Sequence, residues 1–163
     1  LNIRMSPGDG RPDPENDPAD AYEPRISIAR SIEQFTACRA AVGEGFCLLA
    51  AGDANKAERF FQGRLSSAGS NSAQRFSILY GLGLSLVAQG KFVAGQVEFA
   101  KVSSLDHTNR DRKAAALVAL AHAALKLGTA DAPTQAKRWL TTVTDVYGDP
   151  PAAAKASKAL ENL

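Results

Sequence analysis

Apolar residues recur at helical spacing along most of this chain. Leu79, Leu82 and Leu86 are three or four positions apart, and the same spacing returns at Leu117 and Leu120. Such spacing places side chains on one face of an α-helix, and no strand-like alternation is sustained from Ile26 onward. The pattern therefore predicts an all-α domain.

A glycine ends three of the apolar runs, and the three glycines are evenly spaced along the chain. Gly52, Gly90 and Gly128 follow the stretches "FCLLAA", "LSLVAQ" and "HAALKL". Glycine adopts the left-handed conformation that ends a helix without steric cost, so each is expected just past a helix C-terminus. Regular recurrence of this cap predicts a repeated pair of helices.

Small and bulky residues also recur at fixed distances from these glycines. A small residue lies seven positions before each glycine, and a small residue and a phenylalanine lie five and nine positions after the first two. The residues are Gly45, Gly83 and Ala121 before the glycines, and Ala57, Gly95, Phe61 and Phe99 after them. Small residues facing large ones let two antiparallel helices approach closely, so the spacing predicts nested helix pairs.

These positions resemble the tetratricopeptide repeat (TPR), in which W-x2-L-G-x2-Y is followed by A-x3-F and then P. The matching residues are Ala41, Glu44, Gly45, Leu48, Ala57 and Phe61; then Leu79, Leu82, Gly83, Leu86, Gly95 and Phe99; then Leu117, Leu120, Ala121, Ala124, Ala136 and Leu140. The resemblance covers about residues 38–148, with a longer period than is usual for the family and no proline near the end of the first two units.

The resemblance implies a right-handed α-solenoid of about three TPR-like antiparallel helix pairs. Capping helices are expected at both ends, over Ile26–Phe35 and from Pro150 to the C-terminus, because stacked repeats need polar ends. The segments "SSAGSNSA" and "LDHTNRDR" are expected as longer loops between units, and "TADAPTQ" as a turn inside the third.

Residues 1–25 differ from the rest in composition. They hold five of the eight prolines and six acids against three arginines, which predicts a flexible leader before a repeat domain over residues 26–163. An acidic segment that docks on a basic partner is the functional alternative.

The whole chain has a net charge of +2, which favours neither a nucleic-acid binder nor a polybasic membrane surface. The longest apolar run, Ala114–Ala121, is far shorter than the roughly 20 residues that span a bilayer, so no membrane span is expected.

Residues with potential chemistry are few and scattered. Cys38 and Cys47 are expected as buried free thiols, too far apart to bridge if one helix holds both. His107 and His122 lack Cys or carboxylate partners at metal-binding spacing. We expect no enzyme activity, no metal and no cofactor.

Two further stretches have a functional and a structural interpretation. The glycines of "GLGLSL", from Gly81, superficially resemble a phosphate loop, but no strand precedes them and helix packing explains them better. The cluster "NRDRK", Asn109–Lys113, has the charge to touch phosphates but is more typical of a solvated loop.

The resemblance also implies a concave groove along the first helix of each pair, where ligands of this family lie. Its inward positions are Arg39, Val42, Phe46, Leu49, Tyr80, Leu84, Val87, Val118, His122 and Leu125. This mainly apolar surface suits an extended or helical apolar segment of a partner. The alternative is that the surface is covered by the Ile26–Phe35 helix, by the leader or by a second copy of the chain.

Two classes of function follow from these expectations. The first is an interaction module or adaptor that binds an apolar peptide or helix of a larger bacterial assembly, such as a secretion, pilus or envelope complex, in the periplasm or the cytoplasm. The second is a structural solenoid that forms a homodimer or one domain of a longer chain. The helical chaperones of type III secretion translocators, similar in size and repeat count, are a further alternative.

Overall fold

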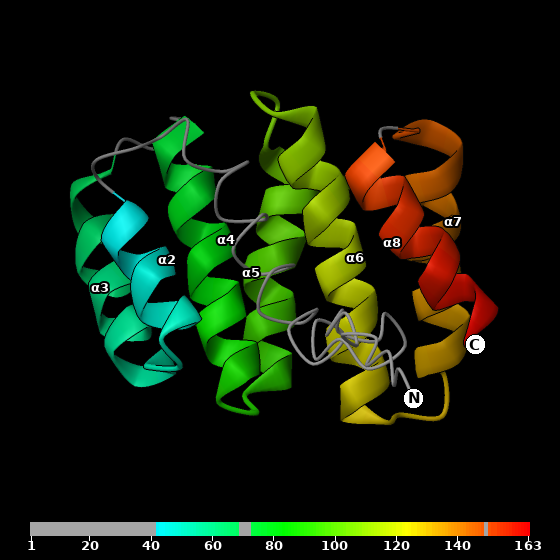
Figure 1. Cartoon of the computed structure of the whole chain (residues 1–163), viewed down its shortest axis with the longest axis horizontal. Helices are drawn as coiled ribbons and strands as arrows, with labels where there is room; N and C mark the ends of the chain where they lie inside the picture. The colour runs from blue at the N-terminus through cyan, green and yellow to red at the C-terminus, as the bar shows by residue number, and fades with distance from the viewer. Residues whose placement is uncertain (1–41, 69–72, 149) are drawn as a thin grey trace, which may run out of the picture.

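The computed structural model describes residues 42–68, 73–148 and 150–163, and all regular structure in these ranges is helical (Figure 1). The helices are α2 (Gly43–Ala50), α3 (Ala54–Ser67), α4 (Ala73–Ala88), α5 (Phe92–Leu105), α6 (Arg110–Leu127), α7 (Ala132–Val146) and α8 (Pro150–Glu161). The all-α prediction is confirmed for this part of the chain. The expected leader and the expected helix over residues 26–35 lie outside the described residues.

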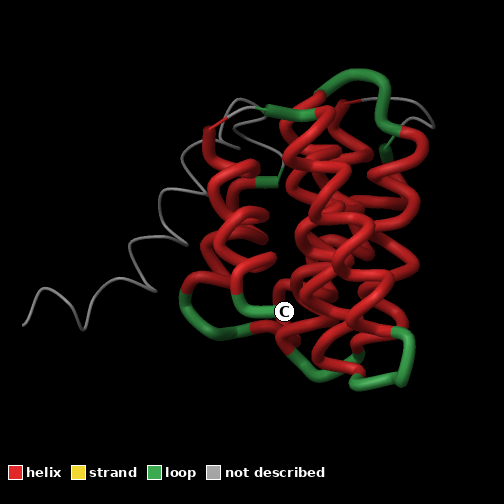
Figure 2. Tube along the Cα trace, turned by 90° about the vertical axis from the view of Figure 1, so that its right-hand side faces the viewer, coloured by secondary structure: helices red, strands yellow, loops and turns green. Residues whose placement is uncertain are grey.

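Each helix packs against the next one in sequence, and the even-numbered helices also contact one another. Helices α2, α4, α6 and α8 touch one another in that order and form a row, while α3, α5 and α7 each pack mainly on the two row helices that flank them in sequence. Figure 1 shows the helices side by side along the longest axis of the molecule, and Figure 2 shows their connections at the two ends.

The three recurring glycines end their helices as the sequence predicts. Gly52, Gly90 and Gly128 have φ angles of 84°, 77° and 71°, and they are the positive-φ residues of the described chain. After α2, the N–H of Asp53 donates to the carbonyl of Leu48 at 2.9 Å, and the equivalent bond after α4 runs from Lys91 to Leu86 at the same distance. These bonds satisfy carbonyls that the helix end leaves unpaired.

Phenylalanine rings lie against helical glycines where the helices meet. Phe61 of α3 is fully buried, and a Cβ on Gly45 of α2 or on Gly81 of α4 would lie 2.5 or 2.3 Å from its ring. Phe99 of α5 lies in the same way against Gly83 of α4, at 2.5 Å. The predicted small-against-bulky contacts are therefore confirmed for the first two units, and the glycines of "GLGLSL" belong to helix packing.

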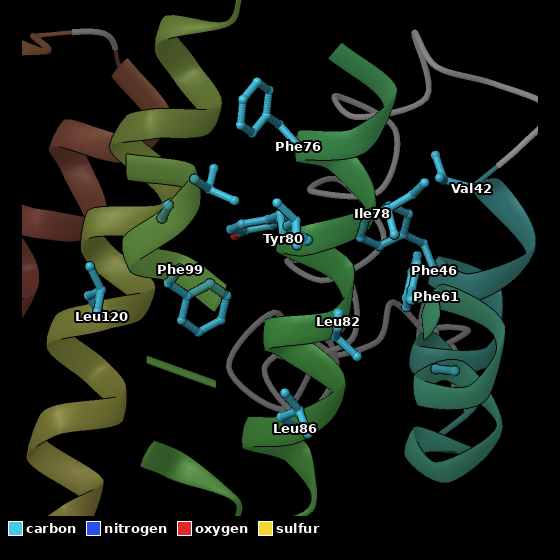
Figure 3. Close-up of a cluster of buried hydrophobic side chains, with 14 residues drawn as sticks. Val42, Phe46, Phe61, Phe76, Ile78, Tyr80, Leu82, Leu86, Phe99 and Leu120 are labelled. Carbon is cyan, nitrogen blue, oxygen red and sulfur yellow. The ribbon is translucent and has the colours of Figure 1, made fainter. Parts of the chain in front are cut away.

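The main core fills the space between the row and its neighbours at α2 to α6. Figure 3 shows Phe46, Phe61 and Ile78 gathered beside Val42, and Tyr80 next to Phe99 further along. The Phe46 and Phe61 rings meet edge to face with centroids 5.2 Å apart, and those of Tyr80 and Phe99 are 5.7 Å apart. Such pairs add to the stabilisation that area burial alone provides. A second core cluster, around Leu140 and Val143, joins α6, α7 and α8.

The three segments expected as non-helical are partly helical, and "SSAGSNSA" begins with the end of α3 and ends with the first residue of α4. The last three residues of "LDHTNRDR" form the first turn of α6, because the side chain of Asn109 accepts a hydrogen bond from the N–H of Arg112 at 2.8 Å and caps the helix. The "TADAPTQ" turn is likewise shorter than expected, since α7 begins at Ala132 with Pro133 in its first turn, where proline is favourable. In "SSAGSNSA", residues 69–72 lie outside the described residues.

The last helix, α8, begins at Pro150 as expected. Its Ala156 is fully buried against the second core cluster, whereas Lys155, Lys158 and Glu161 are exposed. This arrangement gives α8 one packed face and one polar face.

Candidate functional site

The residues predicted to line a groove do not all reach the surface. Val42, Phe46 and Tyr80 are buried in the main core, where aromatic pairing turns the last two rings inward. Burial also raises the pKa of the Tyr80 hydroxyl to about 12. These three side chains offer almost no accessible area to a partner, so the groove surface is smaller than the sequence predicts. Arg39 lies outside the described residues.

Val87 is half-buried and turned toward α5. Its Cγ2 atom lies 2.6 Å from the place that a Cβ on Gly95 would occupy. Its side chain therefore contributes to the contact between α4 and α5.

The remaining five predicted residues are at least partly accessible, and the four apolar ones also pack against the core clusters. Leu49 of α2, Leu84 of α4, and Val118 and Leu125 of α6 are half-buried, and His122 of α6 is exposed. Val118, His122 and Leu125 share one face of α6 because they are four and three positions apart. We call these five residues the row face.

The imidazole of His122 carries less positive charge near neutral pH than a fully solvated histidine does. Desolvation lowers its pKa, and the positive charge of Lys126, one turn further on, lowers it again. The ring is therefore predominantly neutral at pH 7, and covering it with a partner does not require removing a full charge from water.

A buried ion pair that the sequence interpretation missed joins three elements. Arg112 Nε lies 2.6 Å from Asp106 Oδ2, with side-chain exposures of 3% and 0%. The two terminal guanidinium nitrogens of Arg112 donate to Ser77 Oγ of α4 at 2.8 Å and to Thr108 Oγ1 at 3.0 Å. We call these four residues the clamp. The expectation that the whole "NRDRK" cluster is solvated is wrong for Arg112, because its charge is paired below the surface.

The carboxyl of Asp106 is held ionised by its partners. Burial by itself would raise its pKa, but hydrogen bonds from Arg112 and Thr108 outweigh this and leave the pKa below its ordinary value. Oδ1 of Asp106 also accepts hydrogen bonds from the N–H groups of Thr108 and Asn109, at 2.8 and 3.2 Å. An Asp followed two and three positions later by Thr and the Asn cap is the local signal that predicts this turn.

A polar brace links the ends of the first two helix pairs. Glu58 Oε2 of α3 accepts from Gln89 Nε2 at 2.7 Å and pairs with Lys91 Nζ at 2.9 Å. The hydrogen bond from Lys91 is the main reason that the pKa of Glu58 is lowered. The brace therefore links residues more than 30 positions apart in the sequence.

A pocket of about 510 Å³ opens between α3 and α5, over the first turns of α4. Helix α4 packs on both of these helices, whereas contact between α3 and α5 is marginal at most. We call it the α3–α5 pocket; its lining residues are Leu65, Arg75, Phe76, Leu79, Lys101, Leu105, His107 and Thr108. Figure 3 shows Phe76 at one end of α4, apart from the Phe46 and Phe61 rings.

Cys47 is exposed on α2, which corrects the expectation of a buried thiol. Cys38 lies outside the described residues. Within the described ranges, no three His, Cys, Asp or Glu side chains are grouped closely enough to hold a metal ion. No helix in the same ranges combines the length and apolar character needed to cross a membrane.

Comparisons of the chain with protein-family models, with curated proteins and with solved structures gave no match. Function is therefore inferred from the geometry.

Proposed function

We propose that this chain is a non-enzymatic protein-binding module, built as a TPR-like solenoid of about three helix pairs. Two repeated features support the proposal. Left-handed glycines end a helix at equal intervals along the sequence, and a buried phenylalanine lies against a glycine of the preceding helix in each of the first two units. The alternating contacts of α2, α4, α6 and α8 are those expected when helix pairs stack on their neighbours.

The observation that carries the proposal is the row face. Its apolar side chains lie on three consecutive helices of the row and remain partly open to water. Covering such area is favourable by about 25 cal/mol per Å². A partner helix or extended segment with apolar anchors matches this chemistry, and the neutral imidazole of His122 adds a hydrogen-bonding group without a charge.

We further propose that the partner belongs to a larger bacterial assembly. The support is the resemblance of the repeat to adaptors that secretion, pilus and envelope complexes employ. In this arrangement the module contributes recognition, and the chemistry of the assembly lies elsewhere.

The test is selection of peptides from a random display library on the wild-type chain. We expect the selected peptides to carry apolar residues three or four positions apart and to bind His122→Glu at least about tenfold more weakly, since a new carboxylate must then be desolvated. His122 is exposed, so this substitution leaves the fold intact. Val118→Glu tests the same face where the side chain is half-buried.

The matched control is Val93→Glu on α5, where the valine is 59% exposed and away from the row face. It should bind the selected peptides as wild type does. Peptides that bind His122→Glu and the wild-type chain equally well contradict the proposal. A concentration-dependent dimer in light scattering that Leu84→Glu abolishes would instead assign the row face to self-association.

A further inference from the structure

The floor of the α3–α5 pocket is apolar and preformed. Phe76 and Leu79 of α4 are almost completely buried beneath it, and Leu65 and Leu105 line its sides. Leu105 is 57% exposed, which is high for a leucine at the edge of a hollow. A bulky apolar side chain that enters the pocket covers Leu105, and the volume of about 510 Å³ lies within the roughly 300–1,000 Å³ of ligand sites.

Two cationic side chains, Arg75 of α4 and Lys101 of α5, line the same pocket beside the imidazole of His107 from the following turn. No carboxylate is found among its described lining residues. Arg75 also donates to the carbonyl of Leu65 at 3.5 Å, and Lys101 pairs at 2.8 Å with Glu98, outside the lining. Both cations are thus held near the mouth of the pocket.

The clamp fixes one side of the mouth. Thr108 donates to Asp106 Oδ1 through its N–H at 2.8 Å and through its hydroxyl at 2.6 Å, and it accepts from Arg112. The turn that carries His107 and Thr108 is therefore tied to a fully buried ion pair. A site whose edge is already ordered loses less conformational entropy when a ligand binds.

We propose that the α3–α5 pocket is a second binding site, for an acidic peptide segment of a partner protein that carries a bulky apolar side chain between its carboxylates. The apolar side chain fills the space above Phe76 and Leu79, and the flanking carboxylates face Arg75 and Lys101. Charge complementarity and the apolar floor together select this class, because a free phosphate leaves the floor uncovered. The site is separate from the row face and does not depend on the function proposed for that face.

The test is an NMR titration of the full chain with a short blocked peptide that has phenylalanine at its centre and two glutamates on each side. We expect shifts centred on Leu79, Leu105, His107 and Thr108. The peptide with serine in place of phenylalanine should not bind, and the one with glutamines in place of glutamates should bind several-fold more weakly at low salt.

Variants of the chain separate the pocket from general attraction between charges. Lys101→Ala should weaken binding about three- to fivefold at low salt, and Leu105→Ala about five- to tenfold. The matched control is Lys56→Ala, because Lys56 also pairs with an acid three positions earlier, Asp53, at 2.9 Å, but lies outside the pocket. It should bind as wild type does.

Three outcomes overturn the proposal. They are an absence of shifts at millimolar peptide, shifts centred away from the pocket, and equal losses in Lys101→Ala and Lys56→Ala. His122→Glu should leave this binding unchanged. Because the acidic peptide is not one selected on the row face, either site can fail its test without affecting the other.

Discussion

Replacing Gly81 with alanine probes the closest contact in the core. The added Cβ would lie 2.3 Å from Cζ of Phe61 and 2.6 and 2.7 Å from its two Cε atoms. Carbon atoms in contact prefer a separation of about 3.5–4.0 Å, so either the α4 helix or the Phe61 ring must move by more than about 1 Å. The ring has little room to retreat, since it is fully buried and its tip also lies against Gly45 of α2.

Two opposing effects determine how much Gly81→Ala changes the free energy of unfolding. Overpacking of a well-filled core costs about 1–3 kcal/mol, whereas alanine in a helix interior is more favourable than glycine by about 0.5–1 kcal/mol. We therefore expect Gly81→Ala to lower the free energy of unfolding by about 1–2 kcal/mol. For a domain of this size the melting temperature then falls by about 2–8 °C. Urea and thermal unfolding followed by circular dichroism measure the two quantities against wild type.

Gly63 of α3 supplies the matched control. It is also helical, but a Cβ there would meet nothing within 4 Å. Gly63→Ala should therefore raise the free energy of unfolding by about 0.5–1 kcal/mol. If Gly81→Ala proves as stable as Gly63→Ala, the reasoning is refuted. In a double-mutant cycle, Phe61→Leu should cost at least about 1 kcal/mol less in the Gly81→Ala background than in wild type, because the smaller side chain makes room for the methyl.

Two further substitutions test the clamp and a helix end. Because the pKa of Asp106 is lower in the folded chain than the unfolded value of about 3.9, its stabilisation is complete above that value and is lost as the pH falls through the folded-state pKa. The urea midpoint of the wild-type chain should thus decline below about pH 4, and that of Asp106→Asn should decline less steeply. At pH 7 the free energy of unfolding of Asp106→Asn should be lower by about 3–5 kcal/mol, because Arg112 stays buried without its counter-charge. A midpoint equal to that of wild type contradicts this. Gly128→Ala should cost about 1–2 kcal/mol because φ there is 71°, whereas Gly148→Ala, with no positive φ and nothing within 4 Å, should be close to neutral in the same melts.

The features that the sequence predicted are those fixed by short, regular spacing. The left-handed glycines end helices at the three predicted positions because an apolar run followed by glycine determines a helix end locally. The contacts of Phe61 with Gly45 and of Phe99 with Gly83 were also predictable, because each pair belongs to neighbouring helices joined by a short turn. Such pairs need no knowledge of distant parts of the chain.

The features that the sequence interpretation missed depend on residues far apart. The charge of Arg112 is paired locally with Asp106, but its guanidinium also donates to Ser77 of α4, which is distant in the sequence. The charge pattern of "NRDRK" does not indicate that this second partner lies below the surface. Tyr80 occupies a predicted groove position but turns into the core, where it meets the ring of Phe99. Whether such a residue is exposed depends on the rotation of the helix within its packing.

The glycine contacts and the α3–α5 pocket have a common physical origin in α4. Gly81 and Gly83 bring α4 close to Phe61 of α3 and to Phe99 of α5 in its middle turns, whereas its first turns carry the bulky Phe76 and Arg75. Small residues allow close approach and bulky ones prevent it, so α3 and α5 are both held to α4 while a hollow remains between them over its first turns. A change at Gly81 should therefore disturb acidic-peptide binding as well as stability, whereas Gly63→Ala, on the exposed side of α3, should leave that binding unaltered.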